Sequence, residues 1–207
     1  MGVIRVVLTD LDGVIRRWPS TQFSSVEDAH GLPRGSMART AFHATLLTDA
    51  ITGAVTDAEW RRRIAARLGT QTEPAAAAVA AWSVSAGEVD TGTLEVLQAT
   101  RSAAALGLVS NATTRLADDL SRLGISGAFD FIVNSSTVGC AKPSTCFYEH
   151  ALRRSGCTRE EVFFVDDRPE NVAGAVAFGF HGHLYRDAKS LEQALRHAGV
   201  GDPARRK

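Results

Sequence analysis

The chain has 207 residues, of which 44% are hydrophobic and 22% are charged, as in a globular protein with a sizeable core. Because the formal net charge is zero, no overall field favours nucleic acid or an anionic membrane surface as a partner. No segment approaches the ~20 apolar residues of a membrane-spanning helix. The N-terminal apolar run is short and is followed at once by aspartates, unlike a signal peptide. We therefore expect a cytoplasmic protein that binds neither nucleic acid nor membrane.

The first predicted element is a buried strand, an apolar run over residues 3–9 that ends at Asp10-Leu11-Asp12-Gly13-Val14. The stretch over residues 18–90 has no convincing strand and is organised into helical segments. These segments cover residues 26–30, 35–52, 56–68 and 74–82. Thr56 and Glu59 have the spacing of a capping box, which predicts that a helix begins there.

From about Leu94 the chain alternates between helical and strand patterns. Predicted helices cover residues 93–103, 113–123, 144–155, 169–178 and 188–198, and predicted strands cover residues 104–109, 129–133, 162–165 and 181–185. Apolar strands separated by helices are typical of a parallel sheet that is covered on both faces. Together with the first strand, this pattern predicts a doubly wound α/β fold with a five-stranded parallel sheet.

The domain organisation follows from the position of the helical stretch. Residues 1–17 and 91–207 form the predicted α/β core, and residues 18–90 form a helical insertion directly after the first strand. Because the insertion leaves and re-enters the core within reach of Asp10 and Asp12, we expect it to cap the sheet edge at which they lie. The alternative is that its helices only thicken one side of the fold.

Polar residues follow each of four apolar runs along the chain. They are Asp10 and Asp12, then Ser110 and Asn111, then Lys142 with Pro143, and finally Asp166 and Asp167. Taken singly, each group is compatible with a turn or a helix cap. Right-handed crossovers, however, place the carboxyl ends of all parallel strands on one side of a sheet, which is where open α/β sheets bind ligands. We therefore expect the four groups to converge at that edge.

Clustered carboxylates at such an edge fit phosphoryl transfer. Asp10, at the end of a strand, is placed to attack phosphorus and form an aspartyl-phosphate, and Asp12 is placed to act as general acid and base. Several carboxylates meeting a phosphate require a cation, and an all-oxygen site favours Mg²⁺. Ser110 and Asn111 precede a helix expected to start near Thr113, whose N-terminus would cradle a phosphate. Capping of that helix is the alternative role for Ser110.

Lysine is rare in this chain, because only three of its 23 basic residues are lysines. A lysine at position 142, fixed by Pro143 between apolar elements, indicates that a compact point charge is needed rather than a guanidinium fork. A solvated loop lysine is the alternative.

The three cysteines are Cys140, Cys146 and Cys157. They cannot all pair, and their spacings match no zinc-binding pattern. We expect all three to be reduced thiols.

In the order of these four groups, together with Asn171, the sequence resembles the haloacid dehalogenase (HAD) superfamily over essentially the whole chain. More narrowly, it is similar to members with a small helical cap inserted after the first strand. The resemblance implies that Asp10 is the nucleophile and Asp12 the general acid/base. It also implies that Mg²⁺ is held by the Asp10 carboxylate, the Asp12 backbone carbonyl and the last motif. There we expect Asp167 to be the direct ligand and Asp166 to act largely through water.

The resemblance further implies that Ser110 and Asn111 bind the transferred phosphoryl group. Lys142 would contact it as well, neutralising charge between phosphate and nucleophile. Residues 11–19 correspond to a mobile flap that couples cap closure to catalysis. The dehalogenases that give the superfamily its name lack an aspartate at the position of Asp12 and need no metal, so its presence points to a phosphatase.

We therefore expect an Mg²⁺-dependent phosphatase acting on a small phosphomonoester such as a sugar phosphate. A phosphoglucomutase-like phosphoryl transferase shares most of these motifs and stays open as an alternative. A phospho-accepting regulatory module also uses clustered aspartates and a lysine, but response-regulator receivers are shorter and lack the helical insertion. The sequence makes no prediction of the oligomeric state.

Residues of the flap and the cap are candidates for selecting the leaving group. They are Arg16, Arg17, Trp18 and His43. Packing is the alternative role for each. Trp18 would then lie against the cap, and His43 would be an interior histidine in the middle of a helix.

Overall fold

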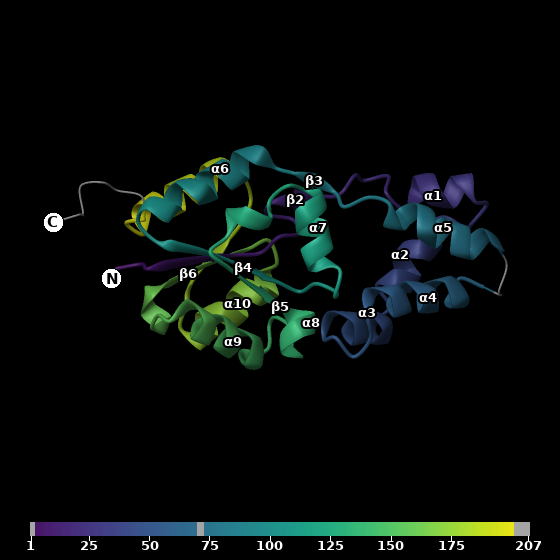
Figure 1. The fold of residues 1–207 in the computed structure, drawn as a ribbon. Helices are drawn as coiled ribbons and strands as arrows, with labels where there is room; N and C mark the ends of the chain where they lie inside the picture. Colours follow the sequence, from purple (N-terminus) through teal and green to yellow (C-terminus); the bar gives the residue numbers. More distant parts are fainter. Residues whose placement is uncertain (1–2, 70–72, 201–207) are drawn as a thin grey trace.

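Figure 1 shows the computed structural model, which describes residues 3–69 and 73–200. Five parallel strands form one sheet in the order β5-β4-β1-β6-β7. The strands are β1 (Val6–Thr9), β4 (Ala105–Ser110), β5 (Phe131–Asn134), β6 (Val162–Asp166) and β7 (His181–Leu184). The predicted fold class and strand number are confirmed. β1 lies at the centre of the sheet and is buried along its whole length, as expected for an apolar strand in a parallel sheet.

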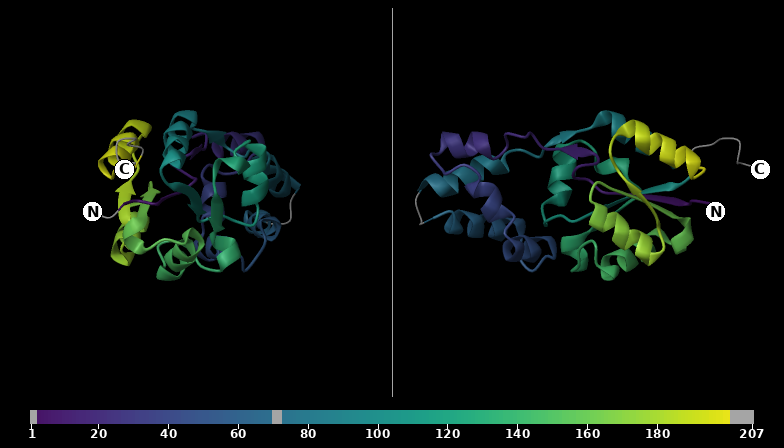
Figure 2. Two further views of the ribbon diagram at one scale, coloured as in Figure 1. Left: turned by 60° about the vertical axis from the view of Figure 1, so that its left-hand side comes forward. Right: turned by 180° about the vertical axis from the view of Figure 1, so that it is seen from behind.

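Helices cover both faces of the sheet (Figure 2). They are α6 (Thr91–Ala99), α7 (Leu116–Arg122), α9 (Thr145–Ser155), α10 (Pro169–Phe178) and α11 (Ala188–His197), with the short α8 (Ser135–Val138) after β5. Along β1 the side chains alternate between the faces. Val7 packs in the same cluster as residues of α6, α7 and α11, whereas Val6 and Leu8 pack with residues of α9 and α10.

A second group of helices lies beyond the carboxyl end of the sheet, on the right of Figure 1. It consists of α1 (Ser24–Ala29), α2 (Ser36–Ala41), α3 (Ala44–Ile51), α4 (Asp57–Arg67) and α5 (Glu73–Ser83). These helices have their own hydrophobic cluster, which includes Met37, Trp60 and Ile64. The chain enters and leaves the group through a two-stranded ribbon, β2 (Arg16–Arg17) paired with β3 (Glu88–Val89).

The sequence pattern did not predict this ribbon, because two-residue strands are too short for an alternation to be visible. The predicted helix over residues 35–52 is two helices, since His43 has extended backbone angles (φ −61°, ψ 128°) at the start of α3. His43 is therefore at a helix boundary rather than in mid-helix. The predicted helix start at Thr56 is confirmed, because its hydroxyl accepts a hydrogen bond from the Glu59 backbone N–H at 3.2 Å. The other half of the predicted capping box is absent, since the Glu59 carboxylate pairs with Arg62 and Arg63.

The helical group contacts the sheet layer at the loop that follows β4. Thr113 donates its hydroxyl hydrogen to Asp57 Oδ1 at 2.8 Å, and the Asp57 backbone N–H donates to Thr114 Oγ1 at 2.9 Å. Gly53 approaches α8 so closely that a Cβ there would lie 2.0 Å from the Ser136 carbonyl oxygen. Among the described residues, no helix is both long enough and apolar enough to cross a membrane.

Candidate active site

Three carboxylates meet where β1 and β6 end. Asp10 directly follows β1, Asp166 is the last residue of β6, and Asp167 comes next. One oxygen from each can be chosen so that all three lie within 4.8 Å of one another. Neighbouring parallel strands are ~4.8 Å apart, so this meeting is a direct consequence of the β1–β6 pairing.

Lys142 lies among these carboxylates and joins two of them. Its Nζ is 2.6 Å from Asp166 Oδ2 and 3.0 Å from Asp10 Oδ1, and it donates to the Val109 carbonyl oxygen at 2.9 Å. Its side chain is 0% exposed. Burial alone would lower the pKa of Lys142, but the two carboxylates outweigh it, so the pKa is raised and the residue is cationic. A solvated loop lysine is ruled out.

The three contacts occupy all three donors of the Lys142 ammonium group. The residue also does not line the cavity described below. The expectation that Lys142 contacts the phosphoryl group directly therefore stays a prediction. In this structure Lys142 is the partner of Asp10 and Asp166, through which its charge acts on the site.

Asn111 holds the loop that carries Lys142. Its Nδ2 donates to the Lys142 carbonyl oxygen at 2.9 Å, and its Oδ1 accepts from the Lys142 backbone N–H at 2.8 Å. Helix α7 begins at Leu116 rather than near Thr113, so Ser110 and Asn111 do not directly precede a helix N-terminus. The predicted helix start near Thr113 is therefore three residues too early, because a turn at residues 113–115 precedes the helix, and phosphate binding by Ser110 and Asn111 stays a prediction.

Asp166 and Asp167 differ in their surroundings. Both oxygens of Asp166 are engaged, since Oδ1 accepts from the Arg168 backbone N–H at 2.9 Å and from Asn171 Nδ2 at 3.0 Å, while Oδ2 contacts Lys142. Asp167 is more exposed and lines the cavity. Gly13 (φ +80°) lies so close that a Cβ there would be 2.0 Å from Asp167 Oδ2, so the Asp-Leu-Asp-Gly turn requires a glycine at that position.

The electrostatics of the carboxylates indicate an unmet demand for positive charge. Burial is the largest cause that raises the pKa of Asp10, to about 6, against the opposing effect of Lys142. Burial, together with Asp166, also raises the pKa of Asp167. A cation between these groups would favour their ionised forms. The donors are all oxygens, which suits Mg²⁺ better than Zn²⁺.

The Asp12 side chain lies outside this carboxylate group. Arg16 Nε and Nη2 donate to its two oxygens, each at 2.7 Å, and Trp18 Nε1 donates to Oδ1, also at 2.7 Å. Arg16 extends from there to Asp119 Oδ2 on α7, at 3.0 Å. The Asp119 contact was not predictable from the sequence, because nothing in the sequence pattern separates that residue from other helical aspartates.

Two of the four specificity candidates line the cavity and two do not. Arg16 and Trp18 contribute to its wall. Arg17 reaches away to Asp90, at 3.3 Å, and to Tyr185 Oη, at 3.2 Å. His43 contacts Thr45 and Arg67 instead. Arg17 and His43 therefore make polar contacts outside the cavity, and His43 is not an interior histidine.

A cavity of about 550 Å³ connects the carboxylates with the helical insertion. Its floor contains Asp10, Ser110 and Asp167, and Asn111 lies beside them. Its opposite wall is largely aromatic and aliphatic, from residues that no motif marks in the sequence. These residues are Phe23, Phe42, Leu47, Ile51, Trp60 and Trp82.

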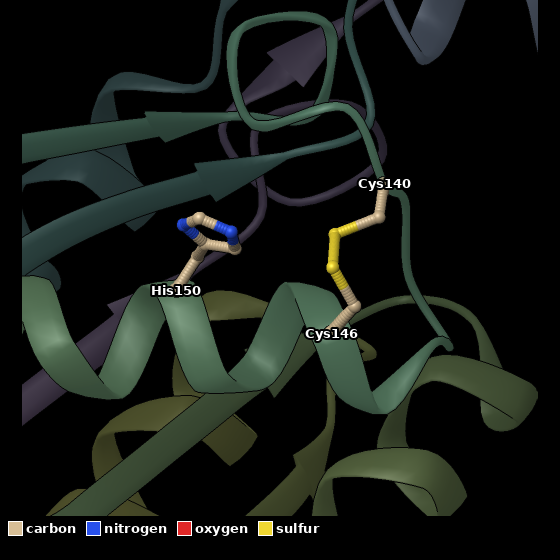
Figure 3. A group of neighbouring side chains, drawn as sticks. All are labelled: Cys140, Cys146 and His150. Atoms are coloured by element: carbon tan, nitrogen blue, oxygen red, sulfur yellow. A yellow bond between two sulfur atoms is a disulfide. The ribbon is translucent and has the colours of Figure 1, made fainter.

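The expectation of three reduced thiols is wrong. Cys140 and Cys146 form a disulfide, and Cys157 is free. Figure 3 shows Cys140 in the loop, with Cys146 and His150 on α9. The loop returns to the start of α9 and brings the two Cα atoms to 6.3 Å, within disulfide range. Sequence spacing alone does not reveal such a return.

A family model described as haloacid dehalogenase-like hydrolase matches residues 4–179. The chain therefore belongs to this family of hydrolases.

Curated relatives match over short segments. Over 93 residues the chain is 36% identical to mouse haloacid dehalogenase-like hydrolase domain-containing protein 3, covering 44% of this chain and 37% of that protein. Over 81 residues it is 41% identical to glyceraldehyde 3-phosphate phosphatase of Methanothermobacter thermautotrophicus, covering 38% of this chain and 36% of the relative. These matches span little more than a third of the relatives' own length.

Solved structures match over nearly the whole fold. A HAD family enzyme from Bacteroides thetaiotaomicron, crystallised as a magnesium complex, superposes with a TM-score of 0.77 at 20% identity, covering 94% of this chain and 100% of that one. The L-2-haloacid dehalogenase of Xanthobacter autotrophicus superposes with a TM-score of 0.65 at 19% identity, covering 98% and 86%. At these identities the likeness shows the shared fold.

Proposed function

We propose that the chain is an Mg²⁺-dependent phosphatase that hydrolyses a small phosphomonoester through an aspartyl-phosphate on Asp10. The observation that carries this proposal is the position of the Asp10 carboxylate. It lies 3.0 Å from Lys142 Nζ, within a group of three carboxylates, at the floor of a cavity. Relatives named glyceraldehyde 3-phosphate phosphatase and pyrimidine 5'-nucleotidase support this choice of chemistry.

In the first step, an Asp10 carboxylate oxygen attacks phosphorus and the bond from phosphorus to the leaving oxygen breaks. Asp12 gives its proton to that leaving oxygen. In the second step, water attacks phosphorus, Asp12 takes its proton, and the bond to Asp10 breaks. Inorganic phosphate leaves and both carboxyl groups return to their initial state. Asp12 must leave its contacts with Arg16 and Trp18 to do this, which assigns the flap over residues 11–19 a gating role.

The Asp10 and Asp167 carboxylates and the Asp12 carbonyl would hold the metal directly, and Asp166, whose two oxygens are already engaged, would act through water. When bound, Mg²⁺ offsets the negative charge that accumulates as a phosphate approaches carboxylates. Lys142 holds the Asp10 and Asp166 carboxylates in position through an ion pair with each, and Asn111 fixes the Lys142 backbone.

Ser110 supplies a hydroxyl to the phosphoryl group from the end of β4, where it lines the cavity. The Asn111 side chain is occupied by the Lys142 backbone, so we assign phosphoryl contact by this residue to its backbone. Residues 18–90 serve as a small helical cap that closes over the sheet edge, and residues 1–17 and 91–207 form the core. The separate hydrophobic cluster of the insertion supports this division.

The test is release of inorganic phosphate from a chromogenic phosphomonoester with Mg²⁺, comparing the wild type with Asp10→Asn. The variant keeps the size of the side chain, so it should fold and lose turnover by at least ~10³-fold, as expected for a removed nucleophile. The matched control is Asp118→Asn, at an exposed position on α7, which should keep full activity. Substantial phosphate release by folded Asp10→Asn protein would remove Asp10 as nucleophile.

A further inference from the structure

The cavity above Asp10 has walls of two chemical kinds. Its floor is polar and contains Asp10 and Asp167, whereas the wall contributed by the helical insertion is largely aromatic and aliphatic, with the polar residues Gln22, Asp57, Arg61 and Ser85 also lining it. A phosphomonoester bound with its phosphorus next to Asp10 must extend its leaving group away from the sheet edge. The leaving group therefore lies against the insertion.

Four aromatic side chains form a continuous cluster on that wall. Phe23 contacts Trp82, with ring centroids 5.3 Å apart, and Trp82 contacts Trp60 at 5.6 Å. Phe42 adds to the edge of the cluster, 5.7 Å from Phe23. Although it belongs to this cluster, Phe42 is 54% exposed. An exposed large aromatic side chain inside a cavity leaves apolar surface in water that a ligand can cover.

The cationic side chains on the cavity wall are already paired with carboxylates. Arg61 Nε lies 2.6 Å from Asp57 Oδ2, and its guanidinium group stacks on Trp82 at 4.4 Å. Arg16 is held by Asp12 and by another carboxylate on α7. Among the described residues, the remaining cation that lines the cavity is Arg168, which lies on the core side and contacts Glu170 at 3.4 Å. The insertion side of the described cavity therefore offers no unpaired cation to a second anionic group on the substrate.

We infer that the leaving alcohol of the substrate is uncharged and predominantly apolar, and that it packs on Phe23, Phe42, Trp60 and Trp82. This inference rests on the proposed phosphatase function and defines its substrate class. Aromatic alcohols and isoprenoid alcohols share the required chemistry. Polyhydroxylated and doubly charged leaving groups do not, since they would bury hydroxyl or anionic groups against a wall that offers them few partners.

The test compares four phosphomonoesters: phenyl phosphate and geranyl phosphate as apolar substrates, and glycerol 3-phosphate and glucose 6-phosphate as polar ones. Burial of an apolar group is worth tens of calories per square ångström, so kcat/KM should favour the apolar pair by at least ~10-fold. The two apolar substrates separate a planar from a flexible leaving group. Equal or better turnover of the polar pair would overturn the inference.

Phe42→Ser tests the wall itself. Because Phe42 is half exposed, its truncation should leave the fold intact. KM should rise by about 5-fold or more for the apolar substrates and stay unchanged for the polar ones, as expected for lost binding to the leaving group. Val176→Ser is the matched control, because Val176 is equally exposed, at 53%, but lies on α10 outside the cavity. An unchanged KM for the apolar substrates in Phe42→Ser protein would contradict the inference.

Binding can be measured without turnover, because all three tryptophans of the chain, Trp18, Trp60 and Trp82, line the cavity. In Asp10→Asn protein with Mg²⁺, geranyl phosphate should change the tryptophan emission at a lower concentration than glycerol 3-phosphate does. If no phosphomonoester is turned over by the wild type, the proposed function fails. If polar substrates are turned over and bind as tightly as apolar ones, only the present inference fails.

Discussion

The two sides of the cavity are stabilised in different ways. At the sheet edge, buried charges are held by other charges, as Lys142 is by Asp10 and Asp166. On the insertion side, the wall is made of aromatic rings in edge-to-face and tilted contact around Trp60 and Trp82. At the sheet edge, Lys142 and Asp166 have a specified partner for each polar side-chain atom, whereas the aromatic wall requires only apolar volume and shape.

This difference indicates that the two sides of the cavity have separate roles. The sheet edge determines the reaction, because removing any of its charged groups leaves a buried charge without a partner. The aromatic wall tolerates change, because apolar residues of similar volume replace one another at modest cost. We therefore expect substitutions at the sheet edge to affect catalysis and folding together, and substitutions on the wall to affect substrate choice.

Lys142→Met should have the largest combined effect. It keeps the aliphatic volume but leaves Asp10 and Asp166 without their buried cation, which should cost about 3 kcal/mol or more of unfolding free energy. Turnover should fall by at least ~10²-fold. Urea unfolding without added metal and steady-state kinetics measure the two effects. Lys189→Met, at an exposed position on α11, is the control. Equal losses of unfolding free energy and turnover in the two variants would contradict a special role for the buried lysine at the sheet edge.

Metal removal should affect the sheet edge alone. Chelation with EDTA should abolish turnover, and Mg²⁺ should restore it, because the three carboxylates lack a sufficient countercharge without it. Asp167→Asn should raise the Mg²⁺ concentration needed for half-maximal rate, as expected when one carboxylate ligand is lost. Full activity in chelator would exclude the proposed metal role.

Asp90→Asn, at the junction between the two regions, should have the smallest effect. Burial raises the pKa of Asp90, but hydrogen bonds from Thr93 and Arg17 outweigh it, so the pKa lies below its ordinary value of 3.8. A lowered pKa stabilises the folded state above pH 3.8, and the contribution is lost as the pH falls through the folded pKa. Asparagine still caps α6, so the variant should lose only about 0.5 kcal/mol at pH 7.

The control for this prediction is the pH dependence itself. Unfolding curves of wild type and Asp90→Asn should converge as the pH is lowered below the Asp90 pKa. A difference that stays constant with pH would show that the cap, and not the charge, carries the effect.

The sheet and the polar groups at its edge were predictable from sequence, for a physical reason. Fully apolar strands such as residues 162–165 have few alternative structures, and a charged residue directly after one must lie at the sheet edge. Asp10 and Asp166 therefore came together as expected. That all three N–H donors of the Lys142 ammonium group are engaged was not predictable from the sequence, because hydrogen-bond partners depend on loop geometry rather than on residue type.

The insertion was predictable only as a set of helices. Its helical periodicity identified α4, but the break before α3 depends on the backbone of His43, which no residue pattern specified. The aromatic wall was also not predictable, since Trp60 and Trp82 lie 22 residues apart on separate helices, and their contact depends on how α4 and α5 pack. The Cys140–Cys146 disulfide depends in the same way on the path of one loop.

The claim that Asp10 itself carries the phosphoryl group can be tested by trapping. Wild-type protein is mixed with a chromogenic phosphomonoester and Mg²⁺, quenched in acid within a single turnover, and treated with borohydride, which reduces an acyl phosphate to the alcohol. Peptide mass spectrometry should then find homoserine at position 10 and unmodified aspartate at positions 12, 166 and 167. Reduction at another aspartate, or at none while phosphate is released in the same time, would contradict the account.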